Sequence, residues 1–445
     1  MTLAFAVHFF DFRNDVRVLL AELVQHHTIV LLVRPEDEAQ IREMAPAGCQ
    51  IRLVRERVAS GSNALWDRLF LQFGRLPKSR QNFYLMEIFK ISINPDAAVR
   101  QRALARLRWR MRLPAWLSYD TYLNNLRYSG QTDLGGIDAF FCFTDIADNY
   151  LLARLVRERR PVSIYVYSWD HPCKHIRYTK RARYLAWSQG MADDLVELQG
   201  IPRAAIEVLG ANQFGYVERY AAPAVLAATP RKWAERYIYF GCAIGIPDLV
   251  EAEVGVAREL ARALAEAMPD WRLVVRPYPV LRAWHHYETL RTEPNVILDD
   301  AFRSKTNLSV TEEQIAEKFA SIYHAEAFLH MGTTLGLEAC FVDTPSFLVD
   351  LERFATDKDA AKLALWPFVH QYQNDKYLGD VPGANKITTP ANLGEVARRI
   401  AAEGKEAYLP FNREARRAFP VRSFAALAEG VRAAAQAWRD KTGGR

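Results

Sequence analysis

The sequence predicts an α/β protein built of two Rossmann-like domains with a ligand cleft between them. Its length of 445 residues suits two or three domains. The first residues have the patterns of a strand, a helix and a strand over Leu3–Phe9, Val16–His26 and Thr28–Val33, which predicts a parallel sheet. This alternation returns at Ile137 and begins again at Tyr237, so we expect two successive sheets.

The composition excludes several other classes of protein. Half of the residues are apolar and a quarter are charged, as in ordinary globular domains. No run of 18 apolar residues suggests a membrane span, and Met1–His8 lacks the basic start of a signal peptide, so we expect a cytoplasmic protein. The five cysteines show no CxxC spacing and HExxH does not occur, so we expect no tightly bound metal.

The first domain is expected to contain a buried parallel sheet. Thr28–Val33 is a continuous run of Thr, Ile, Val and Leu, as in a strand covered by helices on both faces. Helix Val16–His26 follows from the helical spacing of its leucines. The later strands and helices are expected at Ile137–Phe143, Ile146–Arg159, Val162–Tyr167, Tyr184–Trp187, Met191–Gln199 and Ala205–Leu209.

Residues 51–136 interrupt this pattern and are expected to form a helical, basic insertion. Between Arg75 and Arg127, eleven Lys or Arg residues are set against three acidic ones. A helix over Arg100–Arg112 would place arginines beside an apolar face, which suits docking to an anionic membrane or a lipid-linked acceptor. The other interpretation is a solvated helix packed on the domain. No nucleic-acid-binding motif accompanies it, so no nucleic-acid partner is expected.

The second domain is expected after a linker at Ala221–Pro230, which is rich in small residues and proline. Its boundaries are placed at residues 231–415, with the first domain at 1–222 and a C-terminal helical segment at 416–445. The expected strands are Tyr237–Phe240, Arg272–Val275, Val296–Leu298, Ala327–His330 and Ser346–Val349. The expected helices include Thr311–Tyr323, Thr334–Phe341 and Phe424–Trp438.

The most informative motif follows the apolar strand that ends at His330. Gly332, Thr333 and Thr334 form a tight turn into a helix, and the free amides at a helix N-terminus carry a partial positive charge that binds phosphate. Glu338 lies four residues after Thr334 on the same helical face, where a carboxylate can accept both hydroxyls of a ribose. The alternative is an N-cap threonine with a solvated glutamate.

A second candidate group lies after two earlier strands of the same domain. Arg276 directly follows the strand Arg272–Val275, at the edge where open parallel sheets bind ligands. Its guanidinium suits a diphosphate because it donates a bidentate pair of hydrogen bonds and stays charged. Pairing with a neighbouring acid is the alternative. Gly241 follows the strand Tyr237–Phe240 and is a further candidate for contact with the same ligand.

The first domain offers four candidates for an acid or base. Asp170 and His171 follow the strand Val162–Tyr167, in a position suited to taking a proton from a hydroxyl, although a simple turn before Pro172 is the alternative. His8 and Asp11 follow the first strand. Their loop lacks GxGxxG, so it is not a dinucleotide fingerprint.

These motifs together resemble the GT-B glycosyltransferase superfamily. Arg-Pro-Tyr-Pro at Arg276–Pro279 is similar to the Arg-Pro-His-Pro of several sugar-nucleotide enzymes, with Tyr278 in place of the histidine. The segment His330–Pro345 is similar to the donor-binding strand, turn and helix. Ser168–Lys174 resembles bacterial surface-polysaccharide transferases and CDP-glycerol phosphotransferases. Gly332–Leu335 departs from the Asp-Tyr-Ser-Ser-type turn of those phosphotransferases.

The resemblance implies a metal-independent glycosyltransferase of bacterial capsule or O-antigen assembly. A nucleotide sugar would bind the second domain, where the arginine and the turn threonines neutralise the leaving diphosphate and the glutamate holds the ribose. A glycan or lipid-linked acceptor would bind the first domain and lose its proton to Asp170, His171, Asp11 or His8 in an inverting reaction. The C-terminal helix would return to the first domain, and the enzyme would work on the inner face of the cytoplasmic membrane.

Three other functions are compatible with the same fold. One is a non-hydrolysing epimerase of the UDP-N-acetylglucosamine type, which converts a nucleotide sugar without an acceptor. The second is a CDP-glycerol-type phosphotransferase, against which the turn sequence argues. The third is a GT-B-like scaffold without catalytic activity. The basic insertion matches none of these families and is expected to serve the acceptor side.

Overall fold

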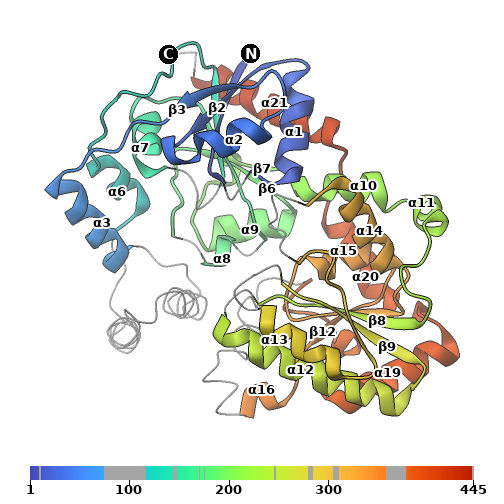
Figure 1. Ribbon diagram of the computed structural model, residues 1–445. Helices are drawn as coiled ribbons and strands as arrows, with labels where there is room; N and C mark the ends of the chain where they lie inside the picture. Colours follow the sequence, from blue (N-terminus) through green and yellow to red (C-terminus); the bar gives the residue numbers. More distant parts are fainter. Residues whose placement is uncertain are drawn as a thin grey trace. The chain divides into compact units, whose positions relative to one another are not determined.

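The structure is a computed structural model of the whole chain, and it contains two α/β units. It describes all residues except 10–11, 75–116, 144–147, 170, 175, 245–246, 279–283, 304–309, 357–376 and 443–445. Each unit is built around one parallel sheet (Figure 1). The predicted pair of Rossmann-like folds is therefore confirmed.

The first sheet has seven strands in the order β3-β2-β1-β4-β5-β6-β7. All neighbours pair in parallel, so each connection must cross a face of the sheet. The strands are β1 (Thr2–Val7), β2 (Thr28–Val33), β3 (Gln50–Leu53), β4 (Ala139–Phe143), β5 (Val162–Tyr165), β6 (Arg183–Ala186) and β7 (Ile206–Val208).

The helices of the first unit include one from the far end of the chain. Helix α21 (Phe424–Thr442) packs against α1 (Asn14–Val24), beside it in Figure 1. Helix α1 buries Val16, Leu19, Leu20 and Leu23, the apolar positions that predicted it. The other helices are α2 (Glu38–Met44), α3 (Gly61–Phe73), α6 (Tyr119–Asn125), α7 (Asn149–Arg157), α8 (His171–Lys174) and α9 (Gln189–Glu197). Helix α10 (Gly215–Tyr220) begins where the chain passes from the first unit to the second.

The expected insertion at residues 51–136 is partly wrong, because its first residues belong to the sheet. Strand β3 pairs in register with β2, from Val30 opposite Gln50 to Val33 opposite Leu53. As an edge strand it stays partly exposed along its length, so its sequence is mixed and lacks the apolar run of a buried strand. Helices α3 and α6 do fall within the expected range, whereas Arg100–Arg112 lies outside the described residues.

The second sheet has six parallel strands in the order β10-β9-β8-β11-β12-β13. Three of them have the predicted bounds, and β13 was missed because two residues carry too little pattern to detect. The strands are β8 (Arg236–Gly241), β9 (Trp271–Arg276), β10 (Val296–Leu298), β11 (Ala327–His330), β12 (Ser346–Val349) and β13 (Lys386–Ile387).

Helices cover both faces of this second sheet. Helices α12 (Pro247–Ala267), α13 (Trp284–Glu288) and α19 (Pro390–Glu403) lie along one face, and α14 (Glu312–Tyr323), α15 (Leu335–Phe341) and α20 (Leu409–Ala418) along the other (Figure 1). Short helices also occur at α11 (Pro223–Ala228), inside the expected linker, and at α16 (Arg353–Thr356). None of the described helices combines the length and apolar character needed to cross a bilayer.

Helix α14 shows how the sequence sets a local boundary. Thr311 accepts a hydrogen bond from the backbone amide of Gln314, whose side chain in turn accepts one from the amide of Thr311. This reciprocal capping box satisfies two amides that the first turn of a helix leaves free. It fixes the start of the helix that carries Glu317 and Lys318.

Gly210, two residues after β7, lies close to the C-terminal segment in a conformation that favours glycine. Its φ is +104°, and a Cβ built there would lie 3.0 Å from the carbonyl oxygen of Pro420, just ahead of α21. The hydroxyl of Tyr165 also donates a hydrogen bond to the Gly210 carbonyl at 3.3 Å. Both strain and crowding therefore oppose a side chain at this position.

Gly210→Ala should lower the free energy of unfolding by about 1–3 kcal/mol because alanine is strained at this φ. Gly61→Ala is the control, since its added Cβ would meet nothing within 4 Å and its backbone is not in the left-handed region. Urea denaturation followed by circular dichroism measures both variants. If Gly210→Ala were as stable as Gly61→Ala, this backbone conformation would be contradicted.

Candidate functional site

The predicted donor residues gather at one edge of the second sheet. The chain runs from β8 outward through β9 to β10, and then returns to the opposite side of β8 to form β11. Open parallel sheets bind ligands at the carboxyl ends of their strands, where the chain reverses its direction in this way. Gly241 pairs with both Arg276 and His330, so these three residues end neighbouring strands side by side.

The turn after β11 is built around the fully buried imidazole of His330. Its Nδ1 accepts a hydrogen bond of 3.1 Å from the backbone amide of Gly332, whose φ of +95° favours glycine. Burial lowers the pKa of His330 to about 3, so the ring is neutral near pH 7. Thr333 and Thr334 follow, both partly exposed, and lead into α15. His330 thus shapes the predicted phosphate turn as a neutral acceptor.

Close packing explains two glycines at this edge, and the explanation requires no ligand. A Cβ on Gly241 would lie 2.6 Å from Cζ of Phe328, a neighbour on β11. A Cβ on Gly336 would lie 2.7 Å from ring atoms of His330. The glycines therefore let the end of β8 and the first turn of α15 approach β11 closely. Contact between Gly241 and a donor stays a prediction.

Arg276 lies at the predicted edge and already has partners there. Its guanidinium carbon is 3.5 Å from the ring centroid of Phe302, and its Nη1 is 3.9 Å from Oδ2 of Asp299, directly after β10. Nζ of Lys232 is 3.0 Å from the other Asp299 oxygen. Burial raises the pKa of Asp299, but the charges of Arg276 and Lys232 outweigh it and hold that pKa below its usual value. Packing and charge therefore orient the guanidinium without a ligand.

Glu338 is buried, so the solvated glutamate considered from the sequence does not describe it. Only 5% of the residue is exposed, and its Oε2 lies 2.6 Å from Nζ of Lys318 on α14. Lys318 is therefore a neighbour of the predicted ribose site that sequence reasoning missed. The pattern held no signal for it, because the two residues are joined only by the packing of α14 on α15.

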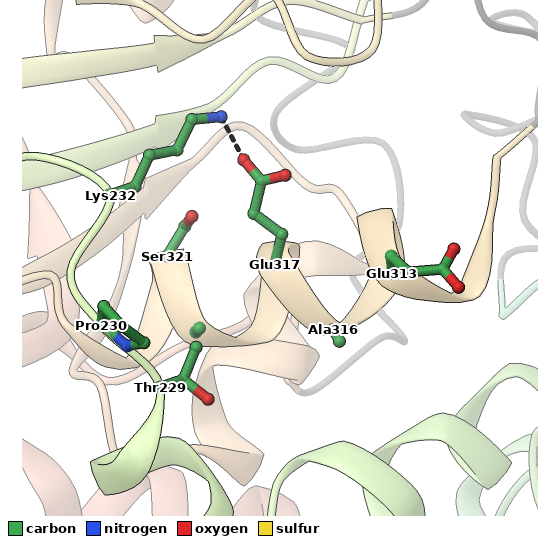
Figure 2. Close-up of a pocket in the computed structure, with 8 residues that line it drawn as sticks. Thr229, Pro230, Lys232, Glu313, Ala316, Glu317 and Ser321 are labelled. Atoms are coloured by element: carbon green, nitrogen blue, oxygen red, sulfur yellow. Dashed lines mark ion pairs between the residues drawn. The ribbon is translucent and has the colours of Figure 1, made fainter.

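A pocket of about 310 Å³ lies beside α14 (Figure 2). Figure 2 shows Lys232 and Glu317 joined by an ion pair at this pocket. Its lining residues are Thr229, Pro230 and Lys232 from the segment before β8, with Glu313, Ala316, Glu317, Ala320 and Ser321 from α14. No predicted site residue lines it, but Lys232 connects it through Asp299 to Arg276.

Sequence reasoning also missed Glu253, a buried carboxyl group on α12. Its two oxygens accept hydrogen bonds from the amide of Ala243 at 2.8 Å and from the hydroxyl of Tyr287 at 2.9 Å. Burial raises the pKa of Glu253 to about 7, although these donors act in the opposite direction. In the sequence Glu253 looks like its neighbour Glu251, which is exposed, so only tertiary burial distinguishes them.

In the first unit, two of the four predicted acid–base candidates lie among the described residues. His171 is 7% exposed and begins α8, a few residues after β5. His8 directly follows β1, and its Nε2 is 3.6 Å from Oδ2 of Asp37. The other candidates, Asp11 and Asp170, lie outside the described residues. Both imidazoles therefore follow strands at the carboxyl edge of the first sheet.

The described part of the chain brings together no group of three or more His, Cys, Asp or Glu side chains suited to a metal ion. His285 and His286 are adjacent on α13 with ring centroids 4.0 Å apart, and they belong to no such group among the described residues.

Glu253→Gln should change how stability depends on pH. The pKa of Glu253 is about 7 in the folded chain against an ordinary value of 4.5, so folding favours its neutral form. Its contribution is fully present below pH 4.5 and is lost as the pH rises through 7, a difference of about 3 kcal/mol. Relative to the glutamine variant, the wild-type protein should therefore lose about that much unfolding free energy between pH 4.5 and 8.

Urea denaturation at several pH values measures this difference. Glu251→Gln, which changes an exposed carboxyl on the same helix, is the control and should follow the wild-type curve. Parallel curves for the wild-type protein and Glu253→Gln would show that the Glu253 pKa is not raised.

No protein-family model and no curated protein matches the sequence, but solved structures resemble it in fold. S. aureus MnaA with UDP has 10% identity and a TM-score of 0.48, covering 97% of this chain and 94% of that one. Teichoic acid polymerase TagF with CDPG has 8% identity, a TM-score of 0.48 and coverages of 99% and 89%. CalG4, the calicheamicin glycosyltransferase, has 15% identity, a TM-score of 0.42 and coverages of 97% and 98%.

The chain resembles these proteins in fold. Both glycosyltransferases and UDP-N-acetylglucosamine 2-epimerases recur among the solved structures that it resembles. Because the identities are at most 15% and the TM-scores quoted lie below 0.5, we infer the function from the residues of this chain.

Proposed function

We propose that this protein is a metal-independent glycosyltransferase of bacterial surface-polysaccharide assembly, such as capsule or O-antigen. It would transfer a sugar from a nucleotide-sugar donor to a glycan or lipid-linked acceptor, with inversion at the sugar carbon. The reaction would take place in the cytoplasm, with Arg100–Arg112 against the inner face of the membrane. The donor would bind the second unit and the acceptor the first.

One observation carries the proposal. Arg276, Gly241 and His330 end three neighbouring strands at the point where the chain reverses across the second sheet. A guanidinium and a glycine turn are thereby delivered to the edge where such sheets bind nucleotides. This placement suits a diphosphate better than an uncharged ligand, because Arg276 is permanently cationic and the threonines after Gly332 carry hydroxyl donors.

The nucleoside diphosphate that leaves in the reaction explains why a cation and hydroxyl donors are useful at this edge. When the bond to the sugar breaks, negative charge develops on the diphosphate. Arg276, with the amides and hydroxyls of Thr333 and Thr334, would stabilise that charge in the transition state. Glu338 would accept hydrogen bonds from the ribose while its other contact is with Lys318.

The acceptor hydroxyl must lose a proton as it attacks the sugar. His171 and His8, which follow strands of the first sheet, would serve as the base or orient the hydroxyl, together with Asp170 or Asp11. An epimerase-like isomerase would instead convert a nucleotide sugar without any acceptor. Incubating the protein with nucleotide sugars alone, and analysing them by NMR, distinguishes the two reactions.

A thermal-shift panel of CMP, CDP, UDP, GDP, ADP and dTDP should identify the donor class. A nucleotide at about 100 times its Kd stabilises the folded state by roughly 2.7 kcal/mol, which raises Tm by several degrees. Glu338→Gln should weaken the binding of the selected nucleotide by about 1–3 kcal/mol because it removes a charged acceptor. If no nucleotide raised Tm, the donor site would be contradicted. If Glu338→Gln bound the selected nucleotide as tightly as the wild type, the role of Glu338 would be contradicted.

Arg276→Ala should weaken binding of the same nucleotide by about 1.5–3 kcal/mol, because a charge-assisted pair of hydrogen bonds is lost. Arg272→Ala is the matched control, since Arg272 lies near the other end of the same strand and donates to the carbonyl of Pro269. Calorimetric titration compares the two. Equal affinities in both variants would favour a scaffold without a donor site.

A further inference from the structure

Two loops at the carboxyl edge of the second sheet are linked through two buried side chains, Glu253 and Tyr287. Glu253 accepts a hydrogen bond from the amide of Ala243 in the loop after β8, and the amide of Ile244 lies at the same carboxylate. Its other oxygen accepts from Tyr287, whose oxygen in turn meets the backbone amide of Tyr278 in the loop after β9. Glu253 and Tyr287 together thus connect the backbones of both loops.

Burying a carboxyl group costs desolvation free energy, which an apolar side chain would not. Glu253 is completely buried, and an apolar side chain of similar size would avoid the desolvation of a charge. The groups that face it are the thiol of Cys242, the two loop amides and the Tyr287 hydroxyl on α13. An apolar residue could not accept these hydrogen bonds. The carboxyl group is therefore matched to holding polar backbone in place.

These loops begin at the residues that carry the donor site. Gly241 and Arg276 are partners in the register, and the amide of Cys242 extends the pairing with a 3.0 Å hydrogen bond to the Arg276 carbonyl. We propose that Glu253 positions the described first residues of these loops, Ala243–Ile244 after β8 and Tyr278 after β9, to receive the diphosphate of the donor. This role rests on the proposed function, and Glu253 acts through the loop backbones without touching the ligand.

Hydrogen exchange and calorimetry on the full chain test this role. Glu253→Leu should speed hydrogen exchange of the Ala243 and Tyr278 amides. It should also weaken binding of the selected nucleotide by about tenfold or more, the selection being made among UDP, CDP, GDP, ADP and dTDP. Glu253→Gln keeps an oxygen acceptor and should retain most of the affinity. Glu251→Gln on the same helix should leave both measurements unchanged.

Tyr287→Phe provides a second variant that removes one hydroxyl and keeps the ring. It should speed hydrogen exchange at the Tyr278 amide, leave the Ala243 amide protected and weaken binding of the diphosphate. If Glu253→Leu does not fold, this variant tests the positioning role in its place. Loops that exchange as in the wild type, or loosened loops with unchanged affinity, would overturn the positioning role while leaving the donor site intact. A wild-type protein that binds none of the diphosphates would overturn the proposed function and this role together.

Discussion

The parallel pairing of β8 with β9 on one side and β11 on the other is the constraint on which the second unit depends. A parallel connection must cross a face of the sheet, so helices cover both faces and every strand ends at the same edge. Residues far apart in the chain are brought together wherever they directly follow a strand. Gly241, Arg276 and His330 meet for this reason alone.

Charged groups at this edge have charged partners that come from other segments of the second unit. Asp299 follows β10 and lies between the cations of Arg276 and Lys232, while Glu338 on α15 meets Lys318 on α14. Buried ion pairs add little net stability compared with apolar packing, since desolvation offsets most of the attraction. Their main effect here is to fix the direction of each charged group, which a site for an anionic ligand needs.

Much of the fold follows from pattern, and the exceptions have physical causes. The buried strands β11 and β12 have the predicted bounds because apolar runs mark strands covered on both faces, and the edge strand β10 has them because its three residues are all apolar. Strand β3 was assigned to an insertion because an edge strand needs no such run. The turn after His330 was predicted as a phosphate site, but its buried, neutral acceptor became evident only when the ring was placed against Gly332 and Gly336.

The sequence by itself determined that the chain forms two parallel α/β units and which residues end most of their strands, since apolar runs and helical spacing are local properties. Only the tertiary structure decided what those residues touch. It gave Arg276 and Glu338 charged partners, and it separated buried Glu253 from exposed Glu251. Burial and pairing depend on contacts between segments that are distant in the chain, and a single sequence carries no local signal for them.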